Sequence, residues 1–260
     1  MDNWWVVVSC MLLSAILAYL YSYKQPKIYA ASTQLLLGTD DIIPVGQNEF
    51  SGTWMAYQKI SNEKRILTSS DLIEQTIQKL KLDVSYYIVG RIQTKRVYEG
   101  MPFAVEGRIY TYTFYDKPFT LKIIDEKMFE LSFENEDKSI TLKHPFDEPL
   151  INNDFYVLVR RGGSLNAITA QTLKEITYQF KIHDISNLIY HYKEALSVQD
   201  VEWTHILQVT LKDENPESAM RFLDTLTYLY MQNSLKSKIQ VNENTIRYID
   251  RHLAEVVNIL

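Results

Sequence analysis

The sequence predicts an α+β protein attached to a membrane by one N-terminal helix. Three observations lead to this prediction. An uncharged apolar run opens the chain, and strand-like and helix-like periods alternate through its middle. The stretch after Pro216 then contains neither Gly nor Pro and keeps a helical period, which predicts one long C-terminal helix.

The composition is that of a globular protein. Of 260 residues, 23% are charged and 46% hydrophobic, which indicates one domain or one domain with a large insertion. A net charge of -5 offers no basic surface for nucleic acid. Cys10 is the single cysteine, so the chain forms no internal disulfide and no cysteine cluster for zinc.

The apolar run Trp4–Tyr23 predicts the transmembrane helix, residues 4–23. Its 20 residues carry no charge and would span about 30 Å as a helix. Aromatic residues stand at both ends, as is typical where a membrane helix crosses the two interfaces. The predicted anchor residues are Trp4, Trp5, Leu12, Leu13, Ile16, Leu17 and Tyr19.

Two other interpretations of this run stay open. A cleaved signal peptide would need basic residues before the apolar run, and Asp2 is the only charged residue there. A buried core helix is the other alternative. Lys24 and Lys27 follow the run and, taken alone, would place the bulk of the chain in the cytoplasm.

Residues 26–102 and 184–235 are expected to form one α+β domain. A strand is predicted at Ile28–Leu37, a loop at Thr39–Gly52, and a helix at Trp54–Leu67. Ser70 is the expected N-cap of the next helix. Apolar residues from Ile185 to Leu196 repeat at helical spacing, and an alternating strand with Leu207, Val209 and Leu211 follows.

A β-rich insertion is predicted at residues 103–183. Strand-like alternation begins near Val84 and continues to Phe180, broken by turn residues. Ile176, Tyr178, Phe180 and Ile182 are expected on one face of its last strand.

The C-terminal helix is expected to start at a capped turn. Asn215 is the predicted N-cap and Pro216 the first helical residue. Residues 236–260 then show a heptad pattern, which indicates the start of an extended, coiled-coil-like helix. An ordinary amphipathic helix is the alternative, because three heptads are the minimum for this pattern. The predicted seam residues are Ile239, Ile246, Ile249, Leu253, Val256 and Leu260.

The sequence carries no familiar catalytic, cofactor or metal motif. It has no phosphate-binding, dinucleotide, zinc-protease or nucleophile-elbow pattern. Its five histidines share no ligand spacing. We therefore expect no enzyme activity, no cofactor and no metal within these 260 residues.

Four stretches together resemble one family. They are YKQPKIYAASTQLLL after the apolar run, Asn62–Ile92, Leu207–Tyr230 with its Asp-Glu-Asn-Pro turn, and Asn242–Leu260. Their order resembles the polysaccharide co-polymerase, or chain length determinant (Wzz-type), family. The family includes the N-terminal halves of bacterial tyrosine autokinases of exopolysaccharide export. No kinase motif is present here, so a kinase domain is left open for the full-length protein only.

The resemblance implies a scaffold in the bacterial inner membrane with its bulk in the periplasm. It would organise polysaccharide (capsule, exopolysaccharide or O-antigen type) polymerisation or export and influence chain length through oligomerisation. The implied partners are copies of itself, a polysaccharide polymerase and an outer-membrane exporter, with polysaccharide as a further candidate. The seam stops at Leu260 without a cap, so we expect the helix to continue.

Two other functions remain open from the residues alone. One is the extracytoplasmic ligand-binding domain of a membrane sensor, which shares the anchor and the mixed fold. The other is a membrane-anchored glycan hydrolase, because a carboxylate pair is spatial and need not show in the sequence.

Overall fold

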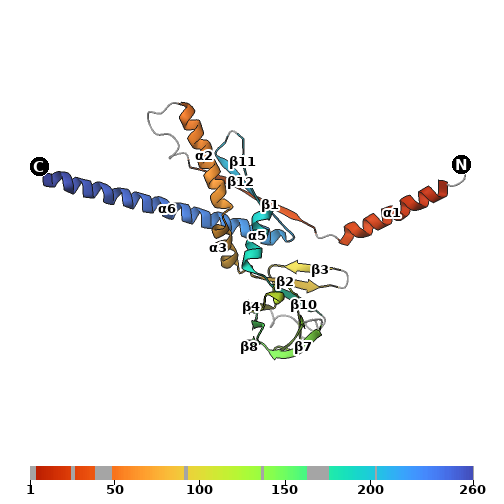
Figure 1. Ribbon diagram of the computed structural model, residues 1–260. Coiled ribbons are helices and arrows are strands. Elements are labelled where there is room, and N and C mark those ends of the chain that lie inside the picture. Colours follow the sequence, from red (N-terminus) through yellow and green to blue (C-terminus); the bar gives the residue numbers. More distant parts are fainter. Residues whose placement is uncertain are drawn as a thin grey trace. The chain divides into compact units, whose positions relative to one another are not determined.

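The computed structural model describes residues 4–24, 27–38, 49–90, 93–135, 138–162, 176–202 and 204–259. The chain divides into two compact units. Ser85–Lys181 lies in the first, which we call the β-sandwich unit, and Met1–Tyr29 is grouped with it. Ala30–Val84 and Ile182–Leu260 form the second, the α+β unit. Figure 1 shows the mixture of helices and strands and the long C-terminal helix, which confirms the α+β class.

Helix α1 covers Trp4–Lys24, so the uncharged run is helical as expected. Its apolar side chains are exposed, with Leu13 62% and Ile16 57% exposed. No helix among the described residues combines the length and apolar character that a membrane crossing requires. The transmembrane segment at 4–23 therefore stays a prediction.

The α+β unit is built on a three-stranded sheet in the order β1-β12-β11. These strands are β1 (Tyr29–Leu36), β11 (Leu196–Asp200) and β12 (Ile206–Asp213), and β11 pairs antiparallel with β12. Alternate residues of the central strand, Leu207, Val209 and Leu211, are fully buried. This alternation gives the sheet one apolar face on which helices can pack.

Helices α2 (Glu49–Leu67), α3 (Ser70–Leu80) and α5 (Ile185–Ala195) belong to the same unit. The predicted cap at Ser70 is wrong by one residue. Ser69 is the N-cap, because its hydroxyl oxygen accepts a hydrogen bond from the Leu72 backbone N–H at 3.3 Å. Residues 39–48 of the loop expected at Thr39–Gly52 lie outside the described residues. Residues 49–52 were also expected in that loop, and this is wrong because α2 begins at Glu49, ahead of the predicted start at Trp54.

The helix expected through Leu196 ends one residue earlier. Leu196 has extended backbone angles and opens β11, where it pairs with Leu211. Its side chain is buried, as a helical residue at this position would also have been, so apolar spacing could not separate the two states.

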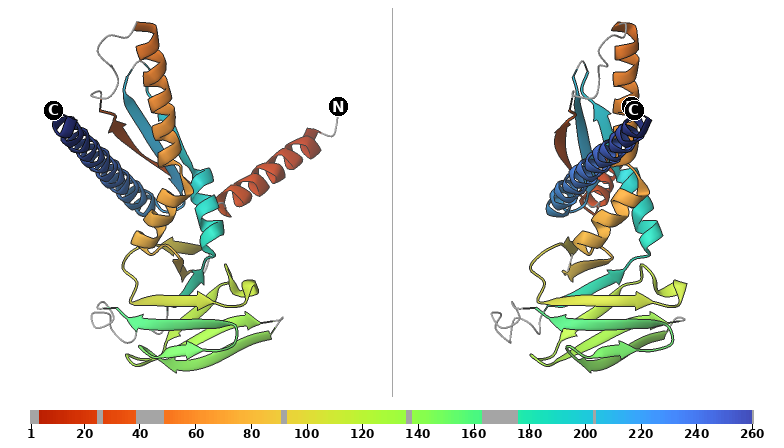
Figure 2. Two further views of the ribbon diagram at one scale, coloured as in Figure 1. Left: turned by 60° about the vertical axis from the view of Figure 1, so that its left-hand side comes forward. Right: turned by 90° about the vertical axis from the view of Figure 1, so that its left-hand side faces the viewer.

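The β-sandwich unit contains two antiparallel sheets (Figure 2). The larger has the order β3-β2-β10-β5-β6-β7 and the smaller the order β4-β9-β8. The smaller sheet is formed by β4 (Phe103–Ile109), β8 (Pro149–Ile151) and β9 (Phe155–Arg161). The strands of the larger sheet are β2 (Val84–Val89), β3 (Thr94–Val97), β5 (Phe119–Ile123), β6 (Met128–Asn135), β7 (Lys138–Pro145) and β10 (Thr177–Ile182).

The β-rich unit thus begins near residue 85, whereas the sequence analysis placed its start at residue 103. Strands β2 and β3 are the reason, because β2 pairs in one sheet with β10 at the far end of the unit. Tyr178, Phe180 and Ile182 of β10 are buried, as predicted for this face, whereas Ile176 precedes the strand and is half-buried.

Aromatic rings fill the space between the two sheets. Phe119 of the larger sheet is fully buried and lies 5.2 Å from Phe155 of the smaller sheet, measured between ring centroids. Phe180 stacks on Phe119 at 5.2 Å, and Phe133 contacts Phe155 at 5.1 Å. Such ring pairs add to the area that they bury, so this cluster supplies much of the core of the unit.

We predict that Phe119→Ala destabilises the protein by about 3–5 kcal/mol, because it removes a ring shared by both sheets and leaves a cavity. Urea unfolding followed by circular dichroism measures the change. Ile151→Ala is the control, since Ile151 is 66% exposed and should shift stability by less than about 0.5 kcal/mol. Equal losses in the two variants would contradict the placement of the core.

Candidate functional site

The candidate site is the surface of helix α6, which covers Pro216–Ile259. Its start is fixed by an Asx turn, as the sequence predicted for Asn215 and Pro216. The Asn215 side-chain oxygen accepts hydrogen bonds from the backbone N–H groups of Glu217 at 2.9 Å and Ser218 at 3.1 Å. Asp213 accepts from the Asn215 N–H at 3.2 Å and so ties the turn to the end of β12. This turn sets the direction in which the helix leaves the sheet.

The first turns of α6 are packed into the α+β unit. The Phe222 ring is fully buried and stacks on Tyr192 of α5 with centroids 4.3 Å apart and planes at 2°. Leu223 and Leu226 are also buried, and α6 contacts α3, α2 and β12. The apolar face predicted for this part of the helix is therefore a packing face.

Polar contacts between α6 and α3 extend the packed part of α6 further along the helix. The Lys79 ammonium group of α3 lies 4.3 Å from the centre of the Tyr228 ring. The Asn233 side-chain amide donates to Gln75 of α3 at 3.5 Å, a long contact. Together these contacts align α6 along α3 as far as residue 233.

Tyr230 makes the most specific contact of this set. Its hydroxyl donates to a Glu63 carboxylate oxygen of α2 at 2.7 Å, and its side chain is 7% exposed. Burial and the adjacent Glu63 carboxylate both raise the pKa of the Tyr230 hydroxyl, burial being the larger cause. The bond joins residues far apart in sequence and was not predicted, since no local pattern marks such a pair.

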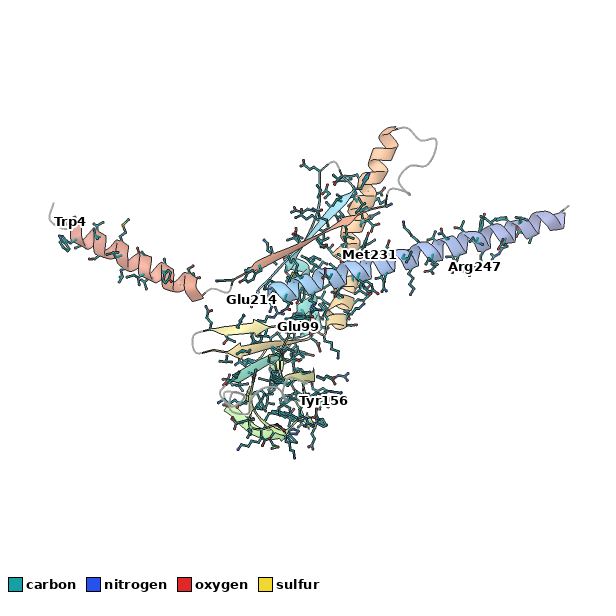
Figure 3. All side chains as sticks on the ribbon, turned by 180° about the vertical axis from the view of Figure 1, so that it is seen from behind. Trp4, Glu99, Tyr156, Glu214, Met231 and Arg247 are labelled. Carbon is teal, nitrogen blue, oxygen red and sulfur yellow. The ribbon has the colours of Figure 1, made fainter. Side chains whose placement is uncertain are left out.

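Beyond this docked part, α6 exposes an apolar stripe. Ile239 and Ile249 are 49% and 52% exposed, and Ile246 and Leu253 are both 59% exposed. All described side chains from Leu235 to Glu255 are exposed. Figure 3 shows side chains projecting from α6 between the labelled Met231 and Arg247 and beyond. We call Ile239, Ile246, Ile249 and Leu253 the seam; Leu260 and the side chain of Val256 lie outside the described part.

The predicted residues form separate features. The turn residues and the seam belong to the start and the exposed half of α6, whereas the anchor residues lie on α1. Within the part of the chain that the structure describes, no group of three His, Cys, Asp or Glu side chains could hold a metal ion.

The comparison with protein families bears on the part of the chain that precedes β2. A family model described as Wzz, chain length determinant protein, matches residues 1–80. The resemblance drawn from the sequence is therefore confirmed for this region. It contains α1, β1, α2 and α3, the last two of which hold α6 through Glu63 and Lys79. No curated protein matches the chain.

The match links residues 1–80 to the determination of polysaccharide chain length at a general level. It ends at residue 80, before the β-sandwich unit and α6.

We predict that Tyr230→Phe makes the stability of the protein decrease less steeply as the pH rises above about 9. The folded-state pKa of Tyr230 lies above its ordinary value of 10.0, so the unfolded chain releases this proton first. The stabilisation is complete below pH 10.0 and is lost as the pH rises further. Thermal melts from about pH 9 to pH 11 should fall less steeply in the variant than in the wild type.

Tyr228→Phe is the matched control for this titration, because Tyr228 lies on the same helix and is 46% exposed. Tyr230→Phe should also cost about 1 kcal/mol at neutral pH through the lost hydrogen bond to Glu63. Identical alkaline slopes in all three proteins would show that Tyr230 does not hold its proton in the way described.

Proposed function

We propose that this protein is an inner-membrane scaffold that influences the chain length of an exported polysaccharide through oligomerisation. The observation that carries the proposal is the Wzz match over residues 1–80. The bulk of the chain would lie in the periplasm. Its partners would be further copies of the chain, a polysaccharide polymerase and an outer-membrane exporter.

Helix α1 is proposed as the anchor. Its central side chains Leu12, Leu13, Ile16 and Leu17 are exposed, which leaves a large apolar surface to be covered. Such a surface is stable in hydrocarbon and unfavourable in water. Trp4 and Trp5, 60% and 69% exposed, would lie at one interface.

The seam of α6 is proposed as the contact between neighbouring copies. A helix that leaves its domain has no tertiary packing to stabilise it, and isolated helices are marginal in water. Burying each seam Ile or Leu would contribute roughly 1.5–3 kcal/mol. A heptad spacing favours another helix as the covering element. Asn242 at a seam position would fix the register at some cost in stability.

The direct test of the function is genetic. Deleting the gene should broaden or shift the length distribution of the surface polysaccharide, and the wild-type gene should restore it. The distribution is measured by gel electrophoresis of the extracted polysaccharide. An unchanged profile in the deletion strain would contradict the proposed function.

We predict that Ile246→Asp with Leu253→Asp weakens oligomers at least about tenfold, because it buries charge in the seam. Sedimentation of the full chain in detergent measures the mass. Ser237→Asp with Asn244→Asp is the matched control, since it adds the same charge to exposed positions on the opposite face of the helix. If both pairs leave the mass unchanged, the seam does not hold copies together.

Membrane attachment gives a separate prediction. Removing residues 1–26 should release a folded protein into the soluble fraction, because α1 carries the exposed apolar surface. Fractionation of cells and circular dichroism of the shortened chain check the two parts of this expectation. A shortened chain that still sediments with membranes would contradict the anchor.

A further inference from the structure

Three tyrosines of the β-sandwich unit fall within residues 110–115. Tyr110 is 57% exposed and Tyr112 is 69% exposed, while Tyr115 is half-buried. The rings of Tyr112 and Tyr115 lie edge to face with centroids 5.9 Å apart. We call these three residues the tyrosine platform. Large aromatic side chains grouped at the surface usually mark a binding site.

The backbone beneath the platform is held firmly. The backbone N–H groups of Tyr110 and Thr111 both donate to the Asp154 carbonyl, at 2.8 and 3.1 Å. The Thr111 hydroxyl donates to the Asp154 carboxylate at 2.9 Å. A 3-10 turn, η1 (Tyr112–Phe114), follows directly. The segment is therefore fixed to the start of β9 before any ligand arrives.

The buried side chain of Phe114 packs the same segment onto the core of the β-sandwich unit. It is 2% exposed and contacts the core rings of Phe155 at 5.4 Å and Phe133 at 6.2 Å. One aromatic residue of the run is thus buried, while Tyr112 is exposed and Tyr115 is half-buried. A Tyr side chain has only two rotatable torsions, so a platform on a rigid turn loses little entropy on binding.

The composition around the platform favours a saccharide over a protein partner. Residues 110–118 read Tyr-Thr-Tyr-Thr-Phe-Tyr-Asp-Lys-Pro, a run in which Pro118 is the only aliphatic side chain. Protein interfaces bury an apolar centre inside a polar rim, and this run supplies no Leu, Ile, Val or Met for such a centre. A sugar ring presents C–H groups on its faces and hydroxyls at its edges. Tyrosine faces can cover the former, while Thr, Asp and Lys groups bond the latter.

We propose that the tyrosine platform is a binding site for a polysaccharide chain, with Tyr110 and Tyr112 stacking on sugar rings. The inference rests on the proposed function, since a scaffold for polysaccharide assembly meets this ligand. It adds a residue-level contact to the β-sandwich unit, which the Wzz match does not reach.

The test uses beads that carry the surface polysaccharide purified from the cells that make this protein. Dextran beads serve as the reference. The full chain in detergent should be retained on the first beads and should be released by the soluble polysaccharide. Tyr110→Ala with Tyr112→Ala should weaken retention by about tenfold or more, as loss of central aromatic contacts does elsewhere.

Two kinds of variant control the result. Tyr190→Ala and Tyr248→Ala remove tyrosines that are 66% and 63% exposed on α5 and α6, and both should bind like the wild type. Tyr112→Phe keeps the ring and should remain within about threefold of the wild type, because stacking needs the face and not the hydroxyl. Circular dichroism confirms that each variant is folded.

Three outcomes would overturn the proposal. These are no retention of the wild type, equal retention on dextran, and wild-type binding by the double variant. The platform would be a protein-docking surface instead if the chain did not bind polysaccharide and if changing the platform abolished a cross-link to another protein in cells. The genetic test separates the two hypotheses. If deleting the gene changes polysaccharide length but the chain does not bind the beads, only the platform proposal is wrong. If the chain binds the beads but deleting the gene leaves polysaccharide length unchanged, only the proposed function is wrong.

Discussion

Phe222 and Tyr192 stack with their planes at 2° to one another, and the course of α6 depends on this contact. The pair lies where α6 crosses α5, directly after the turn at Asn215 that fixes the start of the helix. Once the start and this crossing are set, a straight helix has no freedom left in its direction. Tyr230 and Lys79 then extend the alignment, and the seam follows the same axis outward. The exposed stripe is therefore a consequence of how the buried half is packed.

The sequence predicted features that arise from local chemistry. Asn215 and Pro216 mark the helix start because a cap and a fixed φ act within one turn. The alternation around Tyr178 and Phe180 predicted an inward face because strands repeat every two residues. Ser69 was missed because Ser70 has the same chemistry, and only backbone geometry decides which hydroxyl reaches the N–H of Leu72.

Features that depend on distant pairing were not predictable in the same way. Nothing near Glu63 or Tyr230 indicates that they meet across 167 positions. The pairing of β2 with β10 brings residues near 85 into the β-rich unit, and the sequence could show only that both segments alternate. Leu196 shows a further limit, because one buried Leu satisfies a helix and a strand equally well. The seam was visible in the sequence because heptads are local, although its exposure is a property of the fold.

The seam and the tyrosine platform have opposite chemistry, and this difference separates their proposed roles. The seam is aliphatic and repeats every seven residues, so its side chains can interdigitate with a second helix but offer nothing to a sugar hydroxyl. The tyrosine platform is aromatic and hydroxylated, and it lies on a single rigid turn that is too short to guide a helix. The seam is suited to holding copies of a protein together, and the tyrosine platform is suited to contacting a polysaccharide. A scaffold that acted on a polysaccharide would need both functions, and the two proposed surfaces lie on separate compact units.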